Sequence, residues 1–257
     1  MTRILFIILF LSALKASSSH IVGGNISYVC LGNNTYQFTI SIYRDCLPPA
    51  QGGGNPSALL SDDPAFVSIY NGSSFFSFDS IFYQSSFNIP TNFSNDCINN
   101  PPATCLNRLQ FNLIKVLPPS ANPYTVVYQR CCRNETINNI INPGTTGASY
   151  TCVVPPANVS CNNSAIFVNY PPQIICINNP FIYDHSATDP DGDSLDYYFC
   201  DAIKGGDANN PKPLLIGGSL PFFSSVNYRS PYNPNNPMGG NPVLKIDSKT
   251  GIITGTP

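Results

Sequence analysis

Residues 65–78, AFVSIYNGSSFFSF, decide the fold class of this chain. Two runs rich in β-branched and aromatic residues, Ala65–Tyr70 and Ser74–Phe78, flank the dipeptide Asn71-Gly72. Asn-Gly readily adopts the positive φ angles of a type I′ turn, which joins neighbouring antiparallel strands. The stretch therefore predicts a β-hairpin.

The same pattern of strand and turn continues on both sides of this hairpin. Residues Tyr36–Ile42 alternate apolar and polar side chains, as a half-buried strand does, and a Leu-Gly-Asn-Asn turn joins them to Asn25–Cys30. No stretch shows the 3.6-residue period of an amphipathic helix. Frequent turns between short strands favour an antiparallel β-sandwich. Further strands are predicted at Leu109–Leu117, Tyr124–Cys131, Ser149–Val154 and Ala165–Tyr170.

A domain boundary is predicted at Tyr170-Pro171-Pro172. We expect two antiparallel β-sandwich domains, at residues 19–170 and 171–257. Residues 201–242 form a long stretch rich in Gly, Pro and Asn, and such an insert usually has a function of its own. The second domain has its own predicted strands at Ile174–Cys176, Phe181–Asp184, Leu195–Cys200, Val243–Ile246 and Ile252–Thr254.

The composition excludes several classes of protein. Charged residues make up 10% of the 257 residues and hydrophobic residues 42%, so the chain is poor in helix formers yet able to bury a core. The formal net charge is −2, and no block of basic residues occurs. Nucleic acids and anionic membranes are therefore not expected as partners.

The N-terminus predicts export. Arg3 precedes an apolar run, Ile4–Leu14, and small residues follow it, so residues 1–18 are expected to be a signal peptide. The apolar run is well short of the ~20 residues that span a bilayer, and no second run approaches that length. The sequence thus predicts a secreted or cell-surface protein without a transmembrane span.

The ten cysteines are expected to form disulfides, because their number is even and the chain is exported. Two local pairs are predicted, Cys97 with Cys105 and Cys152 with Cys161. Neighbouring side chains of a strand point to opposite faces, so Cys131 and Cys132 are expected to bond to Cys30 and Cys46 rather than to each other. The last pair would be Cys176 with Cys200. The metal alternative is weaker, because the chain has no CxxC pair and two histidines.

An acidic segment is the strongest candidate for a binding site. Six aspartates lie between residues 184 and 201, several of them at alternate positions around Gly192. Ca²⁺ takes 6–8 oxygen ligands, so such carboxylates can converge on one ion. A plain Asx/Gly turn between two strands remains the alternative. The candidate calcium ligands are Asp184, Asp189, Asp191, Asp193 and Asp196.

No catalytic constellation is evident. The segment Ile21-Val22-Gly23-Gly24 matches the mature start of trypsin-like proteases, but no Gly-Asp-Ser-Gly-Gly segment exists, and neither His20 nor His185 occupies a plausible base position. The single glutamate, Glu135, lies in a predicted exposed turn, which argues against a glycosidase. We therefore expect a protein that is not an enzyme.

Three segments carry a resemblance to a known family: Ser19–Gly24, Ile42–Cys46 and Tyr128–Asn134. They resemble the N-terminal region of large secreted or cell-surface proteins of gliding-type Bacteroidota, which are associated with gliding motility and carried by type IX secretion. Phe181–Cys200 continues the resemblance, and Leu244–Pro257 is similar to the closing hairpin of cadherin-like and Ig-like repeats. The resemblance implies an Ig-like second domain and further domains of the same polypeptide that are missing from this chain.

Two function classes follow from these observations. The first is a non-enzymatic adhesion or surface-structural module, stiffened by calcium, that meets an extracellular protein or polysaccharide surface. The second is the accessory or carbohydrate-binding part of a secreted hydrolase whose catalytic domain is absent.

Overall fold

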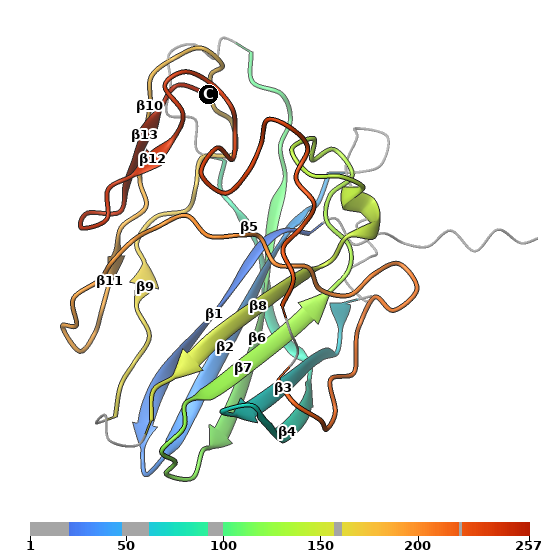
Figure 1. The fold of residues 1–257 in the computed structure, drawn as a ribbon, viewed down its shortest axis with the longest axis vertical. Coiled ribbons are helices and arrows are strands. Elements are labelled where there is room, and N and C mark those ends of the chain that lie inside the picture. The colour runs from blue at the N-terminus through green and yellow to red at the C-terminus, as the bar shows by residue number, and fades with distance from the viewer. Residues whose placement is uncertain (1–20, 48–61, 92–99, 157–160, 221–222) are drawn as a thin grey trace, which may run out of the picture.

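β-Strands are the main regular structure of the described residues. The structure is a computed structural model and describes residues 21–47, 62–91, 100–156, 161–220 and 223–257 (Figure 1). All of its strand pairs are antiparallel, as the sequence predicted.

Two four-stranded sheets make up the larger part of the fold. The first, sheet A, has the order β1-β2-β6-β5, with bounds Ile21–Gly32, Thr35–Asp45, Leu106–Val116 and Tyr83–Ile89. The second, sheet B, has the order β4-β3-β7-β8, with bounds Ser74–Ile81, Ala65–Asn71, Tyr124–Arg130 and Ala148–Val154. A short 3-10 segment, η3 (Pro143–Thr145), precedes β8.

Turn chemistry places the strands where the sequence predicted them. Asn71 pairs with Ser74 at the end of the β3–β4 hairpin, and Gly72 has a φ of 57°. Asn33 and Asn34, between β1 and β2, also have positive φ angles, of 49° and 58°. Both hairpins are thus confirmed, because the residues at their turns tolerate a left-handed backbone.

One hydrophobic core lies between the two sheets. Alternate residues of most of these strands point inward, and the largest of them are fully buried. Sheet A contributes Phe38, Ile40, Ile42, Leu109 and Phe111, and sheet B contributes Val67, Ile69, Val126 and Tyr128.

The outer face of sheet B is covered by the irregular chain of residues 203–220, which crosses in front of β3 and β7 in Figure 1. The Ser68 hydroxyl donates to the Leu215 carbonyl at 2.6 Å, and the Phe75 N–H donates to the Gly218 carbonyl at 3.1 Å. The covering segment explains why outward-facing residues such as Tyr70 and Val127 are also fully buried.

Residues 161–257 carry only short strands among those described. One sheet has the order β10-β13-β12, with bounds Phe181–Asp184, Ile252–Gly255 and Lys245–Ile246, and a second pairs β9 (Ile166–Phe167) with β11 (Ala187–Thr188). These small sheets lie to one side of the large ones in Figure 1.

Several strand predictions were wrong. Leu195–Cys200 and Ile174–Cys176 are not strands, and the predicted strand Ala165–Tyr170 is reduced to β9. β5 was not predicted, because its sequence, YQSSFNI, is mostly polar and its residues are exposed up to Ile89. It forms a strand at the edge of sheet A by pairing with β6.

Candidate functional site

Three aspartates converge in the loop that follows β11. Asp189, Asp191 and Asp193 each place one carboxylate oxygen within 4.8 Å of the others, and the group is largely exposed. The Asp189 side chain shapes the loop, since its Oδ1 accepts the N–H of Asp191 at 2.8 Å and that of Asp193 at 3.2 Å. Gly192 has a φ of 81°, which completes the sharp turn.

Hydrogen bonds through Asn163 link Asp191, the middle aspartate of this group, to sheet A. Asp191 accepts the backbone N–H of Asn163 at 2.6 Å and its side-chain amide at 2.9 Å. The Asn163 Oδ1 in turn accepts the N–H of Cys30, on the edge strand β1, at 2.8 Å. Sequence reasoning missed Asn163, because nothing local in the sequence relates it to a loop 28 residues away.

The other two predicted ligands lie outside this group. Asp184 accepts the N–H of Ser186 at 3.0 Å, and hydrogen bonds from Ser186 lower the pKa of Asp184. Asp196 lies 3.5 Å from the Lys249 ammonium in an exposed ion pair. The structure therefore brings together three of the five predicted residues.

The disulfides differ from the predicted pairing. Cys30 bonds to Cys161, and Cys46 bonds to Cys105, so the predicted pairs Cys97–Cys105 and Cys152–Cys161 were wrong. The β2–β6 register sets Asp45 opposite Leu106, which places the two flanking cysteines side by side. Residues 162–164 run along the edge of β1, which brings Cys161 to Cys30. Cys97 itself lies outside the described residues.

Two further cysteine predictions were wrong. Cys131 and Cys132 bond to each other, because β7 ends at Arg130 and the alternation of a strand no longer applies to them. Cys200 is an exposed free thiol, although Cys176 does take part in a disulfide. Cys152 is also free, and its burial raises the pKa of the thiol to about 12.

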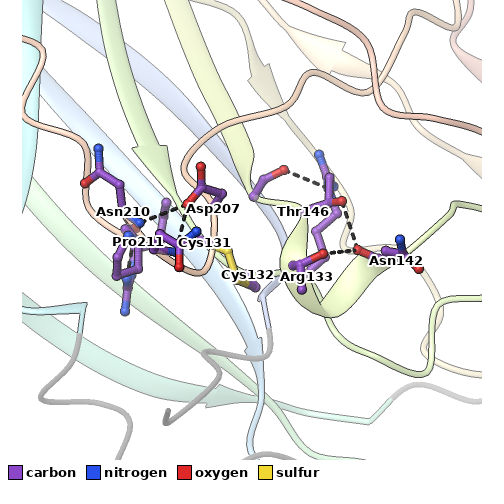
Figure 2. Close-up of a disulfide and its surroundings, with 12 residues drawn as sticks. Cys131, Cys132, Arg133, Asn142, Thr146, Asp207, Asn210 and Pro211 are labelled. Atoms are coloured by element: carbon purple, nitrogen blue, oxygen red, sulfur yellow. Dashed lines mark hydrogen bonds between the residues drawn. A yellow bond between two sulfur atoms is a disulfide. The ribbon is translucent and has the colours of Figure 1, made fainter.

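The Cys131–Cys132 disulfide is buried beneath the chain that covers sheet B. The Cys131 N–H donates to the Pro211 carbonyl at 2.9 Å, and the Arg133 N–H donates to the Thr146 carbonyl at 3.1 Å. Figure 2 shows Asp207, Asn210 and Pro211 on one side of the disulfide, and Arg133, Asn142 and Thr146 on the other.

A buried charge network joins the two large sheets. Asp62, whose side chain is fully buried, accepts from the Arg44 guanidinium of β2 at 2.7 Å and from the Arg130 guanidinium of β7 at 2.6 Å. Burial raises the pKa of the neighbouring Tyr128, whose hydroxyl has no hydrogen-bond partner among the described residues. The sequence offered no signal for this network.

Ile21 and His185, which the sequence analysis considered for catalysis, take part in strand pairing and ring packing. Ile21 at the start of the protease-like segment lies in β1 and donates its N–H to the Cys132 carbonyl at 3.2 Å. His185 stacks on Phe167 with their ring centroids 4.3 Å apart, and its burial lowers the pKa of the imidazole. His20 lies outside the described residues.

Comparison with known proteins gives no relative from which a function could be transferred. No protein-family model, no curated protein and no solved structure matches the chain. Within the described residues, no helix is both long enough and apolar enough to cross a membrane.

Proposed function

We propose that this chain is a non-enzymatic, secreted or cell-surface β-sandwich module for adhesion or surface structure, and that its 189–193 loop binds calcium. The convergence of the Asp189, Asp191 and Asp193 carboxylates is the observation that carries the proposal. The disulfides and the all-β fold with a shared core support an extracellular setting.

Calcium is the cation that matches this loop. Ca²⁺ accepts 6–8 oxygen ligands in flexible geometry, so three exposed carboxylates can share it with backbone carbonyls and water. Each carboxylate oxygen has two lone pairs, so the hydrogen bonds that Asp191 accepts from Asn163 leave ligand capacity. Through Asn163, bound calcium would also stiffen the link between the loop and β1.

The test is thermal unfolding in CaCl₂ and in EDTA. Extracellular modules bind calcium with Kd values of about 10⁻⁴–10⁻³ M. At tenfold excess over Kd, binding stabilises the folded state by about 1.4 kcal/mol, or about 3–6 °C in Tm for a chain of this size. We expect that increment in the wild-type protein.

Asp193→Asn is the most direct variant, because the Asp193 side chain makes no hydrogen bond among the described residues. We expect it to reduce the calcium increment strongly. Asp201→Asn removes the same charge from an exposed position outside the group and serves as the matched control. Equal melting curves of the wild type in CaCl₂ and EDTA would contradict the calcium site and leave a plain turn.

A carbohydrate-binding role is the second candidate, and the outer face of sheet A favours it. The Arg108 guanidinium lies 4.1 Å from the centroid of the Phe87 ring and donates to the Tyr170 hydroxyl at 2.8 Å and to Gln110 at 3.0 Å. The Tyr43 ring meets Tyr170 edge-on. Rings beside amide and guanidinium donors are suited to the faces and hydroxyls of sugars.

Affinity electrophoresis in gels that contain soluble polysaccharides tests this second role. We expect Phe87→Ala to reduce any retardation, because it removes the ring beside Arg108. Ile114→Ala truncates an exposed apolar residue of the neighbouring strand β6 and should have no effect. Equal retardation of both variants and the wild type would argue against sugar binding at this face.

A further inference from the structure

A cavity lies where three distant segments of the chain meet. It has a volume of about 330 Å³, at the lower end of the range typical of small-molecule sites. Its polar lining includes Arg133, Asn139, Tyr228 and the free thiol of Cys200. Its apolar walls are formed by Ile137, Ile140, Phe199, Pro234 and Pro237.

Hydrogen bonds hold these three segments together around the cavity. The Ile141 N–H donates to the Asn227 carbonyl at 2.8 Å, and the Asn139 amide donates to the Pro237 carbonyl at 2.9 Å. The Ala202 N–H donates to the Tyr228 hydroxyl at 3.0 Å. The cavity is therefore formed before any ligand enters it.

Arg133 brings a positive charge into this cavity. Its Nε donates to the Gly147 carbonyl at 3.2 Å, and its Nη2 donates to the Ile203 carbonyl at 3.0 Å. Its Nη1 makes no hydrogen bond with any described residue, and no carboxylate in the described part of the chain lies within ion-pair distance of it. A half-buried guanidinium held by neutral carbonyls lacks the counter-ion that such a group normally has.

The donors that remain match a carboxylate. The Tyr228 hydroxyl accepts the Ala202 N–H, so its own proton is available to a ligand. Together with the two N–H groups of Nη1 of Arg133, the Tyr228 hydroxyl can serve both oxygens of a carboxylate. A phosphate dianion fits less well, because one guanidinium would leave its second negative charge uncompensated between largely apolar walls.

We propose that this cavity binds a small organic monocarboxylate, with its carboxylate on Arg133 and Tyr228 and a compact apolar body against Phe199 and Ile140. The inference does not depend on the calcium loop or on the sugar-binding face, since it rests on different residues.

Cys200 provides the readout. It lines the cavity as an exposed free thiol, whereas Cys152, the other free cysteine among the described residues, is protected by the raised pKa of its thiol. The test measures the rate at which N-ethylmaleimide alkylates Cys200 in the disulfide-intact chain. We expect phenylacetate to slow this alkylation, and the neutral phenylacetamide to bind about tenfold or more weakly. Calorimetric titration of phenylacetate provides an independent affinity.

Two variants and one control separate the charge from the cavity. Arg133→Met removes the charge, and Ala202→Leu fills the cavity while the charge remains; both should abolish protection by phenylacetate. Arg229→Met removes an exposed positive charge outside the lining and should keep it. If Arg133→Met fails to fold, the Ala202→Leu result decides.

Three outcomes would overturn the proposal: equal protection by the carboxylate and its amide, retained protection in folded Arg133→Met or in Ala202→Leu, or protection by inorganic phosphate as strong as that by phenylacetate. The last would show an oxyanion site without recognition of an apolar body.

Discussion

Replacing the buried Asp62 by Asn tests how the two large sheets are held together. The Asp62 carboxylate is fully buried and lies 2.7 Å from Arg44 of sheet A and 2.6 Å from Arg130 of sheet B. The side chains of the two arginines are only 6% and 4% exposed. Asn is almost the same size, so Asp62→Asn removes the negative charge between two guanidinium groups and creates little or no cavity.

The magnitude follows from the burial of all three groups. Removal of one partner from a buried ion pair costs about 3–5 kcal/mol, because the remaining charge stays desolvated. For a chain of this size, 1 kcal/mol corresponds to about 2–4 °C in Tm, so Asp62→Asn should lower Tm by about 6–20 °C. Urea unfolding followed by circular dichroism, with disulfides intact, gives the free energy of unfolding directly.

Asp79→Asn is the matched control for this substitution. Asp79 pairs with Lys115 at 2.8 Å, but both side chains are 23% exposed, so water screens the pair. The control should cost about 1 kcal/mol or less. Equal, small losses in the two variants would refute the reasoning that burial makes the Asp62 network important for stability.

Three further predictions concern other buried groups. Maleimide should label Cys200 and leave Cys152 unlabelled until the protein unfolds, since burial raises the pKa of the Cys152 thiol to about 12. Mass spectrometry of alkylated peptides distinguishes the two cysteines. Rapid labelling of both in the folded protein would contradict the burial of Cys152. Burial raises the pKa values of Tyr128 and Tyr150, so the folded protein keeps protons that the unfolded chain releases near pH 10. These two tyrosines should therefore leave the free energy of unfolding unchanged below about pH 10 and lower it above that pH. Tyrosinate absorbance should show that they ionise only when the protein unfolds. Their ionisation in the folded protein would contradict the prediction. Gly147→Ala should destabilise by about 1–3 kcal/mol in urea, because the new Cβ would lie less than 3 Å from the carbonyl oxygens of Gly206 and Arg130. An unchanged midpoint would contradict this close packing.

The sequence alone determined where most strands of the large sheets lie. Apolar and polar residues alternate through Tyr36–Ile42, and this alternation indicates which side chains face the core. Asn71-Gly72 likewise marks its hairpin locally, although only Gly72 takes a positive φ angle, while Asn71 ends β3 and pairs with Ser74. The clustering of Asp189, Asp191 and Asp193 was also predictable, since the three lie within one short turn.

Tertiary structure alone decided which distant residues became partners. Cys30 bonds to Cys161 across a separation of 131 residues, and the Asn163 side chain lies on Asp191, because a chain segment follows the edge of β1. The pairing of Asp62 with two arginines and the assembly of the Arg133 cavity have the same origin. Periodicity encodes the face on which a side chain lies, whereas the identity of its neighbour depends on strand order, register and the path of the irregular segments, which are set by packing of the whole chain.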